Sequence, residues 1–80
     1  MPPRDTRTRI LDTAERLFAA SGFEGVSLRE VARAARVNSA AVHYHFGARD
    51  GLVEAVVLRR MEPIQRRRRE LLDGLFASGE

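Results

Sequence analysis

A short run between positions 38 and 49 combines small, polar and aromatic side chains. Small side chains come first, and they would let a helix approach base edges in the major groove, which admits one helix. A serine there can bond a base or a phosphate, and alanine methyls can touch a thymine methyl. Imidazole and phenol groups follow, and they can donate to phosphates or pack on sugars. The run comprises Asn38, Ser39, Ala40, Ala41, His43, Tyr44, His45 and Arg49.

These residues fit metal binding and catalysis less well. His43 and His45 stand two apart, so on a helix their imidazoles point to different sides, and the chain has no cysteine to complete a metal site. Ser39 with His43 suggests a nucleophile and its base, but neither oxyanion donors nor a third orienting group can be identified. We therefore expect no enzymatic activity, no metal site and no cofactor.

The net positive charge of the chain is concentrated around this run. The 80 residues carry 14 arginines, no lysine and 11 acidic residues, a formal net charge of +3. Acidic and basic residues balance in 1–26 and again in 50–80, so the whole excess lies in 27–49. A focused basic patch is expected of a protein that binds a polyanion, although a small excess on a solvated face would look the same.

Composition limits the remaining classes. A chain of 80 residues makes one small domain with a thin core. The absence of cysteine excludes disulfides, and no apolar run approaches the length of a membrane span. The first seven residues lack the apolar stretch of a secretory signal. We expect a soluble, cytoplasmic protein with no membrane partner.

The elements that must position the run are helices. Apolar residues recur at helical spacing over 6–21, and Gly22 follows them where a helix C-cap favours glycine. Ser27 and Glu30 have the spacing of a capping box, which predicts a second helix ending at about Ala35.

Two further helices and the start of another are expected downstream. Asn38 is a good N-cap for a short third helix over about 39–45, which Gly47 ends. A fourth helix is predicted over about 49–61. Pro63 should stop or kink it and is well placed to begin a fifth helix.

The second and third helices, with three residues between them, have the pattern of a helix-turn-helix motif. The third helix would enter the major groove. The N-terminus of the second helix, at Ser27, would offer amides and a positive dipole end to a phosphate. Arg29 is long enough to reach a guanine edge, and Arg49 could reach the backbone across the groove.

Residues 27–52 resemble the signature of TetR-family transcriptional repressors, most specifically in Tyr44, His45 and Phe46 followed by a basic residue and a leucine. The segments 9–14, 17–18 and 21–23 are similar to the preceding helix of that family. The similarity covers about 6–62, which is most of the chain.

The resemblance implies an all-α fold, with a homeodomain-like three-helix head, a connecting fourth helix and the start of a fifth. It divides the chain into a disordered arm (1–5), the DNA-binding head (6–47), the connecting helix (48–62) and the beginning of an absent effector and dimerisation domain (63–80). It implies a ligand-responsive repressor that binds operator DNA as a homodimer on a pseudo-palindrome, with a small-molecule effector held by the absent domain. DNA contacts would fall on Ser27, Arg29, Ser39, Ala40, Ala41, His43, Tyr44, His45 and Arg49.

The chain departs from the family pattern at two places. Arg36 stands in the turn where the family usually has glycine, because that residue often takes a positive φ. If the backbone is kept, arginine there should cost about 1 kcal/mol, which a phosphate contact by Arg36 would offset; the alternative is a turn that differs from that of the family. At the start of the fourth helix, Ala48 replaces the preferred serine or asparagine cap, and Gly51 lies in the first turn. Each should weaken that helix start by about 1 kcal/mol.

Several alternatives stay open. Tyr44 could be a core aromatic, Arg29 could serve only to solvate a helix face, and the arginine run 66–69 is best explained as an exposed face balanced by nearby acids. A competing function is a small helical protein-interaction module that uses the apolar stripe of residues 52–76.

Overall fold

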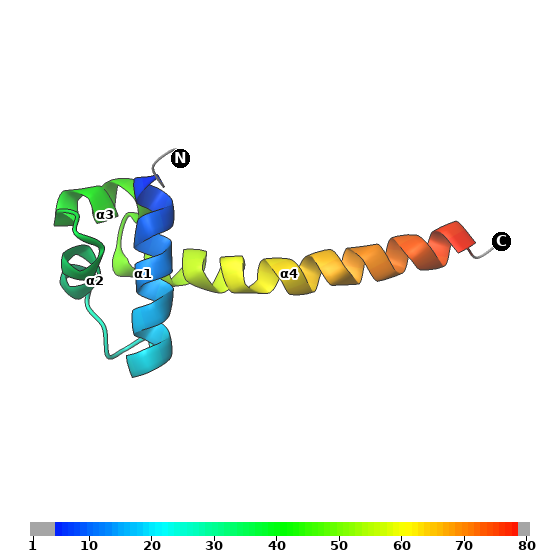
Figure 1. The fold of residues 1–80 in the computed structure, drawn as a ribbon, viewed down its shortest axis with the longest axis horizontal. Coiled ribbons are helices and arrows are strands. Elements are labelled where there is room, and N and C mark those ends of the chain that lie inside the picture. Colours follow the sequence, from blue (N-terminus) through cyan, green and yellow to red (C-terminus); the bar gives the residue numbers. More distant parts are fainter. Residues whose placement is uncertain (1–4, 79–80) are drawn as a thin grey trace.

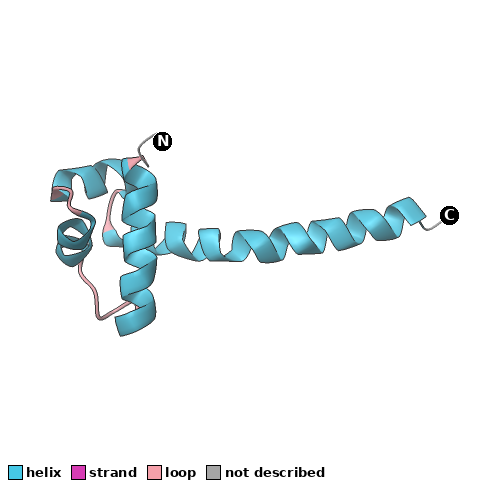
Figure 2. Ribbon diagram, viewed as in Figure 1, coloured by secondary structure: helices cyan, strands magenta, loops and turns pink. Residues whose placement is uncertain are grey.

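The computed structural model describes residues 5–78, which form four helices and no strand (Figures 1 and 2). They are α1 (Thr6–Ser21), α2 (Leu28–Ala35), α3 (Ser39–Phe46) and α4 (Arg49–Ser78). The first three helices and the beginning of α4 make a head, and the rest of α4 extends away from it (Figure 1). Most of the expected N-terminal arm, residues 1–4, lies outside the described residues, as do residues 79–80.

Side-chain caps begin three of the four helices. The Asp5 carboxylate accepts from the Thr8 amide at 2.7 Å and starts α1. Hydrogen bonds from the Thr8 backbone and side chain hold the pKa of Asp5 below its ordinary value. The predicted capping box of α2 is confirmed, with both bonds between Ser27 and Glu30 formed. The predicted cap of α3 is confirmed too, because the Asn38 side chain accepts from the Ala41 amide at 2.9 Å.

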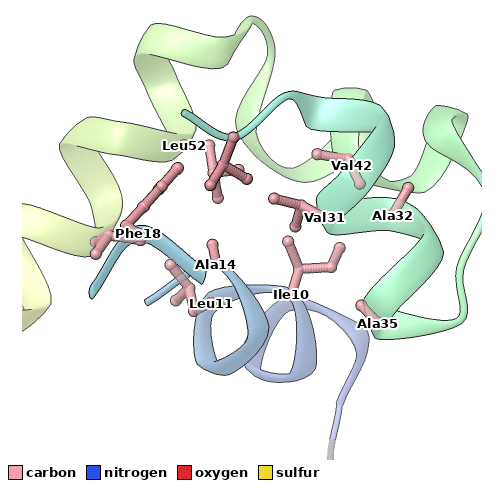
Figure 3. Packing of buried hydrophobic residues seen from close by; sticks show 11 residues of the cluster. Ile10, Leu11, Ala14, Phe18, Val31, Ala32, Ala35, Val42 and Leu52 are labelled. Atoms are coloured by element: carbon pink, nitrogen blue, oxygen red, sulfur yellow. The ribbon is translucent and has the colours of Figure 1, made fainter. Parts of the chain in front are cut away.

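The core is small and, apart from Phe18, aliphatic, and every helix contributes to it. Side chains of α1 face those of α2 and α4 across the head (Figure 3). The largest fully buried side chains are Ile10, Val31, Val42 and Leu52, one from each helix. The last buried residue of the described chain is Val56, so the core closes there and the remaining turns of α4 do not belong to it. The full set is Ile10, Leu11, Ala14, Phe18, Val26, Val31, Ala32, Ala35, Val42, Leu52 and Val56.

The predicted end of the fourth helix at Pro63 and the fifth helix beginning there are wrong. Helix α4 runs without interruption over 30 residues with Pro63 inside it, so there is no separate fifth helix in the described chain. Proline removes one backbone hydrogen bond from a helix interior. Pro63 is exposed here, so water can satisfy the carbonyl that loses its partner, and strong helix formers flank the proline on both sides.

Candidate nucleic-acid interface

Helix α3 exposes one continuous face. Ser39, Ala40, His43 and Tyr44 are all exposed, and their i, i+1, i+4, i+5 spacing places them on the same side of the helix. Val42, on the opposite side, is fully buried and anchors the helix to the core. The exposed face therefore carries small side chains in its N-terminal half and larger ring side chains in its C-terminal half.

The rings of Tyr44 and His43 on this face differ in their exposure and hydrogen bonding. Tyr44 is 84% exposed, which excludes the alternative that it is a core residue. His43 Nδ1 lies 2.9 Å from the Gly47 carbonyl oxygen, which can only accept, so Nδ1 carries a proton. A neutral His43 therefore presents Nε2 as an acceptor, suited to an amino group on a base edge, and only the protonated ring can donate to a phosphate.

The capping residues keep donors that a ligand can use. The Ser27 hydroxyl accepts from the Glu30 amide at 3.1 Å, yet its own hydrogen remains to be donated. The Asn38 carbonyl oxygen is occupied by the Ala41 amide, whereas the side-chain NH₂ of an asparagine carries two donors. Ser27 and Asn38 can thus cap a helix and bind a phosphate at the same time.

Arg49 takes an inward position. Its Nε donates to the Val26 carbonyl oxygen at 3.2 Å, and its Nη2 is buried without a hydrogen-bond partner among the described residues. Arg49 and Ser27 line the same shallow hollow beside the N-terminus of α2. In this conformation Arg49 holds the loop before α2, so a DNA contact by Arg49 requires the guanidinium to turn outward.

Most of the predicted DNA-contacting residues are exposed, and Arg36 adopts the backbone conformation that was in question. Arg36 has φ 61° and ψ 46°, the left-handed conformation that the comparison with the family pattern anticipates for this turn. Eight of the eleven candidate DNA-contacting residues are exposed, namely Ser27, Arg29, Arg36, Asn38, Ser39, Ala40, His43 and Tyr44, whereas Ala41, His45 and Arg49 are half-buried.

Two arginines of α1 that the sequence did not single out support the motif. The Arg7 guanidinium lies over the Phe46 ring, 5.1 Å from its centroid, at the end of α3. Arg9 donates to backbone carbonyls at the end of α2. Both partners are more than 25 residues away in the sequence, so no local pattern could have revealed either contact.

A second group of charges ties α1 to α4. Arg59 donates to Asp12 at 2.8 Å and also to Glu15, and Arg60 donates to Glu15 at 3.0 Å. The hydrogen bonds from Arg59 and Arg60 hold the pKa of Glu15 below its ordinary value. These ion pairs join α1 to α4 just beyond Val56, the last core residue of the described chain.

The described part of the chain, residues 5–78, brings no three His, Cys, Asp or Glu side chains together in a way that could hold a metal ion. None of its helices has the length and apolar character needed to cross a membrane.

The head matches a described family of proteins. Residues 10–56 fit the family model of bacterial regulatory proteins, tetR family, and this range coincides with the first and last residues of the core. The chain is 30% identical over 70 residues to the HTH-type transcriptional regulator UidR of Escherichia coli, a match that spans 88% of the chain and 36% of UidR.

Two other matches agree with this one. The HTH-type transcriptional regulator SrpR of Pseudomonas putida is 36% identical over 61 residues, covering 76% of the chain and 29% of SrpR. The crystal structure of HlyIIR, a hemolysin II transcriptional regulator, superimposes with a TM-score of 0.61 at 37% identity, covering 64% of the chain and 28% of HlyIIR. The chain therefore spans about a third of the length of the relatives it matches.

Proposed function

This chain belongs to the TetR family of bacterial regulatory proteins, and from that premise we propose that it is the DNA-binding head of a transcriptional regulator. Helix α3 would lie in the major groove of double-stranded operator DNA. The N-terminus of α2 and the arginines around the motif would contact the phosphate backbone.

The observation that carries this proposal is the exposed face of α3. A groove-reading helix must be held rigidly on one side and must leave small side chains free on the other. Val42 provides the first condition, and Ser39 with Ala40 provides the second. The large ring of Tyr44 stands further along the same face, where it can reach the sugar-phosphate wall of the groove.

Regulation would depend on parts of the protein beyond these residues. As the family implies, two heads would bind a pseudo-palindrome as a homodimer, and the bound dimer would exclude the polymerase from the promoter. A small-molecule effector would be bound by a C-terminal domain that begins in the last turns of α4. A single head should bind DNA weakly and with little specificity.

A charge placed on the α3 face tests the proposal. Ala40→Glu should weaken binding to a fluorescent DNA duplex by about tenfold or more, because the new carboxylate would meet base edges and phosphates. Ala20→Glu is the matched control, since Ala20 is an exposed alanine of α1 outside the motif. Fluorescence anisotropy at low salt measures both affinities.

An equal loss in the two variants would show that only the net charge matters, and the assignment of α3 to the groove would then fail. Circular dichroism should show that both variants keep the helical content of the parent chain.

A further inference from the structure

The turn between α2 and α3 holds a residue whose backbone conformation is unfavourable for it. Arg36 is the only residue other than glycine with a positive φ among the described residues. A side chain with a Cβ atom is strained in this left-handed conformation, which glycine adopts freely. The turn must therefore be held from outside, because the angle between α2 and α3 depends on it.

The backbone of the turn provides part of that support. The Arg36 amide donates to the Arg33 carbonyl at 3.2 Å, and the Val37 amide donates to the Ala32 carbonyl at 3.0 Å. This pair of bonds is a Schellman motif, in which the residue at the left-handed position is normally glycine. The carbonyls of Ala35 and Arg36, at the end of the turn, accept from no backbone amide of the described chain.

Arg9 of α1 bonds to those two carbonyls. Its Nη2 donates to the Ala35 oxygen at 2.5 Å and lies 3.5 Å from the Arg36 oxygen. The cationic guanidinium also lies at the C-terminal end of α2, where the helix dipole favours positive charge. Arg9 is half-buried, so water screens this contact less than it would a surface pair.

The geometry points to Arg9 as a positioning residue for DNA binding. From α1 it clamps the strained turn at Arg36 and thereby fixes the angle at which α3 meets DNA. This inference rests on the proposed function, since it assigns to Arg9 a role in presenting α3 rather than a contact of its own with DNA.

A double-mutant cycle with Arg36→Gly tests the clamp. In the parent chain, Arg9→Gln should weaken binding to a mixed-sequence duplex of about two helical turns by about five- to tenfold. In the Arg36→Gly background, Arg9→Gln should weaken binding to the duplex by less than about twofold, because a glycine turn needs no clamp. Both chains of the Arg36→Gly background lack the Arg36 side chain, so a DNA contact made by Arg36 does not affect the ratio of their affinities.

Two control variants separate the clamp from its charge. Arg9, Arg16 and Arg36 line one shallow hollow between α1 and the turn. Arg16→Gln removes a positive charge from α1 there without removing a bond to the turn, so it should change the affinity less than about twofold. Arg9→Lys keeps the charge but lacks the guanidinium fork, so it should lose part of the affinity. Anisotropy is measured at a temperature where circular dichroism shows every variant fully folded.

Each outcome has one meaning. The clamp would be overturned if Arg9→Gln lowered the affinity equally in the two backgrounds, or if Arg16→Gln lowered it as much as Arg9→Gln does in the parent chain. Either result would leave the proposed function intact. If the parent chain itself fails to bind the duplex, the proposed function fails. Amide hydrogen exchange of Val37 without DNA then still reports whether Arg9→Gln loosens the turn.

Discussion

At the residue scale, the exposed ring of Tyr44 offers the simplest separation of binding from folding. Tyr44→Ala should change the free energy of unfolding by less than about 0.5 kcal/mol, since the side chain is 84% exposed. The same substitution should weaken DNA binding by about tenfold or more, because it removes a large side chain from the α3 face. Urea unfolding and anisotropy measure the two effects.

Tyr44→Phe is the companion variant. It keeps the ring and loses only the hydroxyl, so it should bind with an affinity between those of the parent chain and the alanine variant if the hydroxyl donates to a phosphate. Unfolding of the chain by Tyr44→Ala would mean that the ring supports the head, and the assignment of Tyr44 to the interface would fail.

At the element scale, the close approach of α4 to the end of α3 explains the glycine in the first turn of α4. A Cβ atom added to Gly51 would lie 2.0 Å from the Phe46 carbonyl oxygen, so this position brings the start of α4 against the end of α3. Gly51→Ala should therefore destabilise the head by about 2 kcal/mol, although alanine is normally the better helix former. Urea unfolding measures the change.

Gly74 of the same helix is the matched control. A Cβ atom there would meet nothing within 4 Å, so Gly74→Ala should stabilise the helix by about 1 kcal/mol. If both substitutions stabilise the chain, the close approach of α3 and α4 is not as tight as the structure has it.

The junction of α1 and α4 should make stability depend on pH. The bonds from Arg59 and Arg60 lower the pKa of Glu15 in the folded chain below its ordinary value of 4.5. Between the lowered pKa of the folded chain and pH 4.5, the unfolded chain therefore binds more protons than the folded chain does. The ion pair consequently contributes stability above pH 4.5, and this contribution is lost as the pH falls through the lower folded value.

Glu15→Gln should remove this contribution to the pH dependence of stability, and it should lower the free energy of unfolding at neutral pH by about 1 kcal/mol or less. The urea midpoint, followed from neutral to acidic pH, should fall less steeply for this variant than for the parent chain. Glu24→Gln changes an exposed carboxylate outside the junction and should follow the parent curve. Identical curves for all three chains would contradict the role given to the junction.

Most helix boundaries follow from local signals, and most of the supporting contacts do not. The capping box of Ser27 and the cap at Asn38 involve residues three apart, so the sequence is sufficient to predict where α2 and α3 begin. The clamp by Arg9 joins residues 26 and 27 apart, and the inward position of Arg49 depends on the loop at Val26. Such contacts exist only once the helices have packed.

Pro63 marks a different limit of prediction. Its effect on a helix depends on whether water can satisfy the carbonyl that loses its hydrogen bond, and therefore on burial, which the local sequence does not specify. In the structure Pro63 is exposed and α4 continues through it. The face of α3, by contrast, could be predicted because its residues share one short, capped helix.

At the scale of the whole molecule, the head and the extended part of α4 have different surfaces. The molecule measures 55 × 33 × 21 Å because α4 continues beyond the core. Its outer turns expose apolar side chains, among them Ile64, Leu71, Leu75 and Phe76, and the arginine run 66–69 includes ion pairs from Arg66 and Arg69 to Glu62. The excess positive charge belongs to residues 27–49 of the head.

This distribution of charge predicts a strong dependence of DNA binding on salt. Arginines that neutralise phosphates release bound counterions, so the affinity should fall about tenfold or more between about 50 and about 200 mM salt. Anisotropy titrations at several salt concentrations measure the slope. An affinity independent of salt would contradict binding through the basic head.

The most direct test of the central claim is an NMR titration of the ¹⁵N-labelled chain with a short DNA duplex at low salt. The α3 interface predicts amide shifts clustered at Ser27–Arg29 and Ser39–His45 that added salt reverses. An absence of shifts there at high DNA excess, with concentration-dependent broadening along Ile64–Phe76, would contradict it. That result would identify the apolar stripe as the functional surface instead.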